Sequence, residues 1–142
     1  MFIGIPAGLL LGLGFYTFGY ARGASYMTND PAACVNCHVM RTQYEGWKKA
    51  SHRQAAVCND CHTPPGTLAK YGTKALNGFF HSLAFTTGWF PDEIRITERN
   101  FKVTESSCLK CHAEVVEGIR ATRHSGQNVA CTTCHRNVGH QH

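Results

Sequence analysis

Charged residues and strand-forming patterns are both scarce in this sequence of 142 residues. Only 16% of the residues are charged. The lysines and arginines form no stripe interleaved with aromatic side chains, which is the pattern typical of a nucleic-acid-binding surface. Runs that alternate apolar and polar residues are sparse, which disfavours a β-sheet fold. We therefore expect a mainly α protein with no nucleic-acid partner.

No cysteine is left over for a disulfide, because all eight belong to one repeated pattern. They form four pairs, two residues separate the members of each pair, and a histidine follows directly. The four motifs are Cys34-Cys37-His38, Cys58-Cys61-His62, Cys108-Cys111-His112 and Cys131-Cys134-His135. Redox dithiols, zinc ribbons and disulfides all use paired cysteines, but none of them requires a histidine after every second cysteine.

This pattern is the signature for attachment of a c-type haem. Two thiols at this spacing can bond to the two vinyl groups on one porphyrin edge, and the next side chain can then bind the iron. The sequence thus predicts four covalently bound haem c groups. Because the motifs come as two close pairs on either side of residues 63–107, we expect a compact domain of short helices and loops with two di-haem halves.

The N-terminal segment is a candidate membrane anchor. Residues 2–20 contain no charged side chain and are nearly all apolar or glycine. A helix of this length rises about 28 Å, close to a hydrocarbon core of roughly 30 Å. Aromatic residues gather toward its C-terminal end, as they do at a membrane–water interface.

A cleavable signal peptide is the alternative, and Ala21 and Ala24 would permit cleavage. The segment lacks a basic leading region and its apolar stretch is longer than that of a typical signal peptide. We therefore predict a single transmembrane helix within an anchor of residues 1–24, and a tetrahaem domain of residues 25–142. That domain should lie in the periplasm, since c-type haems are attached on the outer side of the bacterial inner membrane.

Four haems with two axial positions each need four ligands besides the motif histidines. The other histidines are His52, His81, His124, His140 and His142. His140 lies too soon after His135 to reach the far face of the same haem, so it should bind another one. The same argument applies to His52, which lies just before the second motif. His124 could bind the iron of either neighbouring motif.

Met40 is a further candidate ligand. It follows His38 by two residues, so the two side chains cannot easily bind opposite faces of one iron. Either His38 binds the first haem and Met40 packs beside it, or Met40 replaces His38. A thioether ligand would raise the potential of that haem relative to haems with two histidines.

Residues 66–85 predict a helix with one polar stripe. Lys70, Lys74, Asn77 and His81 follow one another at steps of four, three and four, and apolar side chains cover the rest. Such a helix can lie in a membrane interface. The alternative is an ordinary amphipathic helix with a solvated lysine face. Given the predicted anchor, we expect this helix to lie in the membrane interface.

On these residues the chain resembles the NapC/NirT/NrfH family of membrane-anchored tetrahaem cytochromes, in particular its NrfH branch. The resemblance covers essentially the whole chain and rests on CVNCHVM, ASHRQAAVCNDCHTP, KALNGFFHSLAF and CTTCHRNVGH. It implies a quinol dehydrogenase that oxidises menaquinol at the bacterial inner membrane. The expected partner, in a hetero-oligomer, is the pentahaem nitrite reductase NrfA. Another periplasmic reductase, such as a nitrate reductase, and a soluble tetrahaem carrier similar to cytochromes c3 are the alternatives.

The resemblance also implies axial ligands of three haems. Met40 becomes the leading candidate for the first haem. His140 would pair with His62 on the second haem, and His52 would pair with His135 on the fourth.

The quinol pocket and the third haem follow from the same resemblance. Lys74 and His81 would line the pocket beside the first haem, with His81 as proton acceptor, as sixth ligand of that haem, or as both at different times. A quinol loses protons with its electrons, so its site needs an apolar entrance, a nearby haem and proton acceptors. The third haem, at His112, would take its sixth ligand from His124 or from the partner enzyme, and we expect His124.

Overall fold

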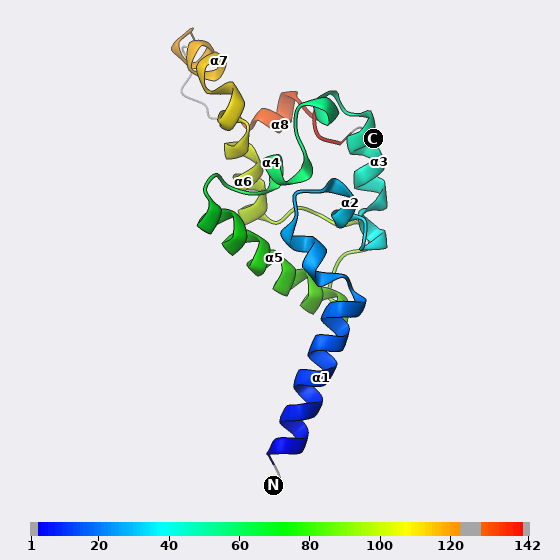
Figure 1. The fold of residues 1–142 in the computed structure, drawn as a ribbon. Coiled ribbons are helices and arrows are strands. Elements are labelled where there is room, and N and C mark those ends of the chain that lie inside the picture. Colours follow the sequence, from blue (N-terminus) through cyan, green and yellow to red (C-terminus); the bar gives the residue numbers. More distant parts are fainter. Residues whose placement is uncertain (1–2, 123–128, 141–142) are drawn as a thin grey trace.

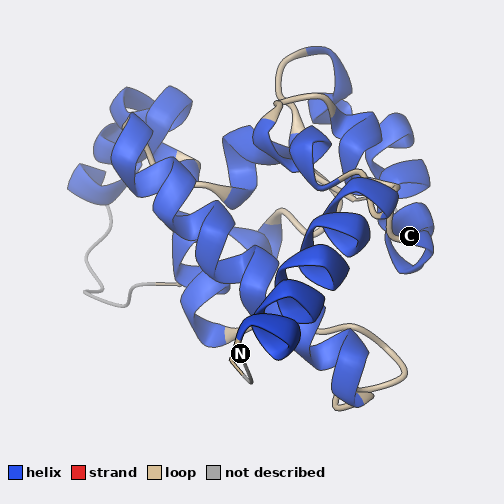
Figure 2. Cartoon of the chain, turned by 60° about the horizontal axis from the view of Figure 1, so that its bottom comes forward, coloured by secondary structure: helices blue, strands red, loops and turns tan. Residues whose placement is uncertain are grey.

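The computed structural model describes residues 3–122 and 129–140, and this part of the chain is helical without a β-strand (Figure 2). The prediction of a mainly α fold is confirmed. The helices are α1 (Gly4–Tyr20), α2 (Pro31–Cys34), α3 (Arg41–Lys49), α4 (Cys58–His62), α5 (Thr67–Thr87), α6 (Glu98–Ser107), α7 (Leu109–Thr122) and α8 (Cys131–Cys134). Three 3-10 turns complete the order, namely η1 (Gly23–Met27), η2 (His38–Met40) and η3 (Ser51–Gln54).

Helix α1 stands clear of the other helices (Figure 1), and all of its residues are exposed. Within residues 3–122 and 129–140, no helix combines the length and the apolar character needed to cross a membrane. The division of the chain into an anchor of residues 1–24 and a haem domain of residues 25–142 stays a prediction.

The chain turns sharply where α1 ends. Arg22 takes a left-handed backbone conformation with φ of 51°, which costs free energy in a residue with a Cβ atom. Gly23 follows, and the ring of Phe18 folds back over it, so a Cβ atom at this position would require that exposed ring to shift.

Helix α5 crosses the body of the molecule next to the end of α1 (Figure 1). It begins after Gly66, whose φ of 87° is left-handed, and ends at Gly88, whose φ of 68° is also left-handed. Both positions favour glycine, which adopts this conformation without a steric penalty. Gly78, near the middle of α5, lets the ring of Tyr26 from η1 approach closely, to 3.4 Å from the position of a Cβ atom.

Candidate multihaem site

Each motif lies on or beside a short helical turn. The second and fourth motifs form α4 and α8, the first begins at the end of α2, and the third spans the junction of α6 and α7. A helical turn brings residues three apart to the same side, so the two cysteines of a motif can face one porphyrin edge. His112 departs from helical geometry, with φ of −110° and ψ of 15°, and α7 is kinked there.

The first cysteines of the motifs meet in two pairs. The thiols of Cys34 and Cys58 lie close enough to interact, which lowers the pKa of Cys34 to about 7 and raises that of Cys58. The thiols of Cys108 and Cys131 likewise perturb each other. The structure thus brings together the first motif with the second and the third with the fourth, which are the pairs that the sequence groups into di-haem halves.

The residues present fit covalently bound haem. All eight cysteines are free thiols and none is fully buried. Although 43% of the sequence is hydrophobic, Ala50 is the one buried hydrophobic residue of the described chain. Even a small protein domain buries roughly 60% of the surface that its unfolded chain exposes. The sparse protein core and the four pairs of free thiols are what a domain organised around bulky prosthetic groups requires.

His62 of the second motif lies opposite His140, with ring centroids 5.9 Å apart. The Nδ1 atom of His140 is 2.8 Å from the backbone oxygen of Gln43, to which it can donate. Thr104 donates its hydroxyl proton to the oxygen of Asn100 and lies 3.4 Å from Nδ1 of His62. Both rings are thereby held by Nδ1, which leaves Nε2 for an iron. Burial, followed by the neighbouring His140, lowers the pKa of His62 to about 4.

The ring of His52 lies beside the third motif. It meets the ring of His112, with centroids 6.0 Å apart and planes at 75°. An open hollow of about 630 Å³ is lined by residues 49–51 on one side and residues 134–138, including His135, on the other. His52 directly follows the first of these segments. The structure therefore brings His52 against His112, while the implied pairing with His135 stays a prediction.

The structure says less about the candidate axial ligands of the first and third haems. His38 and Met40 both lie on the 3-10 turn η2, where His38 is exposed and Met40 is half-buried. The choice between them as ligand stays a prediction. His124 lies outside the described residues.

Lys74 is the most deeply placed cation of the predicted polar stripe, with 4% of its surface exposed. Its Nζ atom donates to the backbone oxygens of Tyr26 and Thr28, at 2.9 and 2.6 Å. Desolvation, followed by the nearby Lys70, lowers the pKa of Lys74. The charge of Lys74 also acts on Cys34, where it lowers the thiol pKa, so the lysine lies close to the first motif.

The rest of the stripe also faces the body of the molecule. Lys70 donates to Oδ1 of Asn29 at 2.6 Å, and Asn77 accepts hydrogen bonds from Arg99 and Asn100 on α6. His81 is exposed; partial desolvation, followed by the charge of Arg99, lowers its pKa. The alternative of a solvated lysine face is therefore wrong, because the buried Lys74 and its neighbours bond to other segments.

The apolar side of α5 is instead the exposed one. Its large side chains are exposed by 37 to 92%, namely Leu68, Tyr71, Leu76, Phe79, Phe80, Leu83 and Phe85. The loop that follows adds Trp89, which is 91% exposed. An exposed apolar surface of this extent marks a site of contact with lipid, ligand or protein.

Sequence reasoning missed three polar residues that hold the motifs in place. They are Thr104, Glu105 and Lys110. Lys110 donates to the backbone oxygens of Asp60 and Thr63 at 2.7 and 2.5 Å, which ties the third motif to the end of the second. The partners are about fifty positions apart, so no local pattern could have indicated them.

These features define a multihaem c-type cytochrome. The chain belongs to the NapC/NirT cytochrome c family, whose N-terminal region matches residues 2–142. The family resemblance inferred from the sequence is thereby confirmed.

Individual relatives agree with this membership. The chain is 36% identical to the cytochrome c-type protein NrfH of Wolinella succinogenes, over 93% of this chain and 80% of that protein. It is 33% identical to the cytochrome c nitrite reductase subunit NrfH of Nitratidesulfovibrio vulgaris, over 95% and 86%. A crystal structure of the cytochrome c nitrite reductase NrfHA complex bound to the inhibitor HQNO contains a chain that matches with a TM-score of 0.70 at 29% identity, covering 94% of this chain and 90% of that one.

Proposed function

We propose that this chain is the NrfH-type cytochrome subunit of a cytochrome c nitrite reductase complex. In this role it oxidises menaquinol and passes the electrons through four haem c groups to a nitrite reductase partner. The similarity to two NrfH proteins and to a chain of a solved NrfHA complex supports the role and the partner.

The observation that carries the quinol site is the arrangement of α5. Its polar stripe bonds to the segment just before the first haem motif, through Lys74 and the backbone oxygens of Tyr26 and Thr28. Its opposite side exposes a continuous set of large apolar residues. A lipid-soluble quinol therefore has an apolar approach on one side of a helix whose other side adjoins the first motif.

The chemistry divides between the haems and the side chains. Haem iron, when bound, accepts electrons singly. Oxidation of one quinol releases two electrons and two protons, so the site must also accept protons. The His81 imidazole can accept a proton at the exposed end of the stripe, while the Lys74 ammonium can polarise a quinol oxygen. Each proton then leaves to the periplasmic water that reaches His81.

The proposed location is the bacterial inner membrane, with the haem domain in the periplasm. The apolar sequence of residues 2–20 provides the attachment, and α1 covers Gly4–Tyr20 of it. The family match begins at residue 2, which favours an anchored protein over a soluble carrier. Helix α5 lies next to the end of α1 (Figure 1), and its exposed apolar side chains would rest on the lipid surface.

A substitution at His81 tests the quinol site. The variant His81→Ala should keep four haems but lose reduction by menaquinol, while reduction by soluble dithionite stays intact. Ser82→Ala, at the next exposed position of α5, is the matched control and should behave as the wild type does. Normal menaquinol turnover in His81→Ala would refute the assignment of the site.

The partner is tested separately by purification from the native membrane. We expect the chain to bring down a multihaem protein that reduces nitrite to ammonium. Recovery of a nitrate reductase in its place would support the alternative partner. A mature N-terminus near residue 25, measured by mass spectrometry, would favour the soluble carrier.

A further inference from the structure

The fourth haem motif begins a helix that has no capping side chain of its own. α8 is preceded by Ala130, whose side chain accepts no hydrogen bond. By contrast, Asp30 caps α2 before the first motif by accepting from the backbone N–H of Ala32 at 2.8 Å. The first amides of a helix need an acceptor from outside the helix, so those of α8 must find one elsewhere in the fold.

That acceptor is the carboxylate of Glu105 on α6. The backbone N–H of Cys131 donates to Oε2 at 2.5 Å, and the backbone N–H of Thr132 donates to Oε1 at 3.1 Å. The hydroxyl of Thr132 donates to the same Oε1 at 2.6 Å. A carboxylate in this position also complements the partial positive charge of the helix N-terminus. One side chain thus satisfies three donors of the fourth motif.

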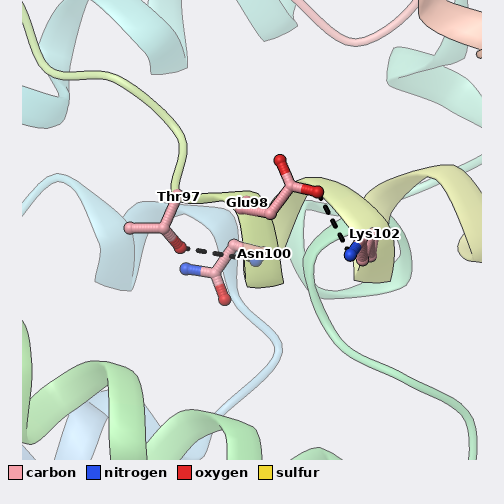
Figure 3. A network of polar contacts seen from close by, with 4 residues as sticks. All are labelled: Thr97, Glu98, Asn100 and Lys102. Atoms are coloured by element: carbon pink, nitrogen blue, oxygen red, sulfur yellow. Dashed lines mark hydrogen bonds and ion pairs between the residues drawn. The ribbon is translucent and has the colours of Figure 1, made fainter.

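Helix α6 has a capped start and bonds to the segment after the second motif, so it can fix the position of the fourth-motif turn that Glu105 binds. At its start, Thr97 accepts from the backbone N–H of Asn100, and Glu98 forms an ion pair with Lys102 at 3.1 Å (Figure 3). Near its end, the hydroxyl of Ser107 donates to the backbone oxygen of Thr63, just after the second motif. The same helix leads directly into Cys108 of the third motif, whose thiol lies close enough to that of Cys131 for each to affect the pKa of the other.

We infer that Glu105 is a positioning residue for the fourth haem, because it fixes the turn that presents Cys131 to the porphyrin and keeps a negative charge beside that haem. A nearby negative charge favours the oxidised, more positive iron and so lowers the reduction potential. The inference needs only haem attachment at the fourth motif, and neither quinol oxidation nor the nitrite reductase partner enters it.

The test uses the full-length, haem-loaded protein and two readouts other than activity, namely the intact mass and the midpoint potentials of the four haems. Glu105→Ala should yield a fraction of chains that carry three haems. Glu105→Gln should keep four, because the amide oxygen still accepts from Thr132, but the potential of one haem should shift upward. Glu98→Gln, on the same helix but bonded to Lys102, is the control and should leave mass and potentials unchanged.

Wild-type haem content in Glu105→Ala together with wild-type potentials in Glu105→Gln would overturn the inference. If the Glu105→Ala protein does not accumulate in cells, the Glu105→Gln variant alone tests the inference. An upward shift of one potential, or loss of one haem, supports the role, and four unchanged potentials refute it.

Discussion

The rings of His62 and His140 face each other across 5.9 Å, and the Nδ1 atom of each lies beside an oxygen of another helix. The oxygens belong to Thr104 on α6 and Gln43 on α3. Because Nδ1 is engaged in both rings, Nε2 is the nitrogen that remains for iron. This pair is the most completely positioned axial site of the described chain, and it joins the second motif to the C-terminal segment, which lies far away in the sequence.

His140→Ala should remove the sixth ligand of the second haem. We expect one of the four haems to change from a low-spin to a high-spin absorption spectrum, while all four stay covalently attached. Thr42→Ala, an exposed position on α3 next to Gln43, is the control and should keep the wild-type spectrum. Four low-spin haems in His140→Ala would contradict the pairing.

Thr104→Val should raise the potential of the second haem without removing a ligand. The hydroxyl of Thr104 accepts from Nδ1 of His62, and such a bond makes an axial histidine more electron-rich. Losing one hydrogen bond of about 1 kcal/mol corresponds to about 40 mV for a one-electron couple. Thr104→Ser keeps the hydroxyl and should restore the wild-type potential. A redox titration that cannot distinguish the valine variant from the wild type would rule out this effect.

Lys74→Met should weaken both the fold and quinol oxidation. The substitution removes the buried ammonium of Lys74 from the backbone oxygens of Tyr26 and Thr28, although Thr28 still accepts from Asn59 at 3.0 Å, and it should cost about 2 kcal/mol. We expect a lower thermal unfolding midpoint and slower reduction by menaquinol. Lys70→Met loses a single bond to the exposed Asn29, so it should lower the midpoint much less. Equal effects of the two variants would argue against a special role for Lys74.

Phe79→Glu should weaken the proposed contact of α5 with lipid. Phe79 is 64% exposed, and moving a phenylalanine side chain out of water contributes about 1.5 to 3 kcal/mol. The KM for menaquinol in liposomes should therefore rise by about tenfold or more, with no change in reduction by dithionite. Val115→Glu on α7, at a residue 63% exposed, tests whether any added charge has this effect. An unchanged KM in Phe79→Glu would place the quinol entrance elsewhere.

The hydrogen bonds of Glu105 should make the stability of the fold depend on pH. Desolvation by itself raises the pKa of Glu105. The hydrogen bonds from Thr132 and Cys131 outweigh it, so the pKa lies below its usual value of 4.5. A carboxylate with a lowered pKa in the folded state stabilises the fold above its unfolded pKa, and the contribution is lost as the pH falls through the folded pKa. Unfolding midpoints measured from pH 7 to pH 3 should therefore fall more in the wild type than in Glu105→Gln. Parallel curves would show that the carboxylate contributes nothing.

The haem motifs and the helical fold could be predicted because both are local. Each motif occupies five consecutive residues, and the helix of residues 66–85 follows from the spacing of Lys70, Lys74, Asn77 and His81. The same spacing could not tell which side of that helix faces outward. That depends on acceptors far away in the sequence, such as the backbone oxygens of Tyr26 and Thr28, and they turned the lysines inward.

The individual side chains that hold the motifs in place were beyond spacing arguments for the same reason. Nothing near Ala130 indicates that Glu105 caps α8. The position of His52 is similar: its spacing excludes the nearest haem, but only the packing of η3 brings its ring to His112. Family resemblance supplied candidate pairs, of which His62 and His140 lie close together in the structure, with ring centroids 5.9 Å apart.

The near absence of buried hydrophobic residues in the described body, with Ala50 as the exception, bears on how this protein matures. A chain with so little cohesion of its own gains most of its stability only as porphyrins are joined to it, much as small metal-dependent domains fold when loaded. Newly exported polypeptide should then remain open to the attachment machinery and, equally, to proteases. Cellular haem supply would in that way govern how much of the cytochrome survives to reach its respiratory partner.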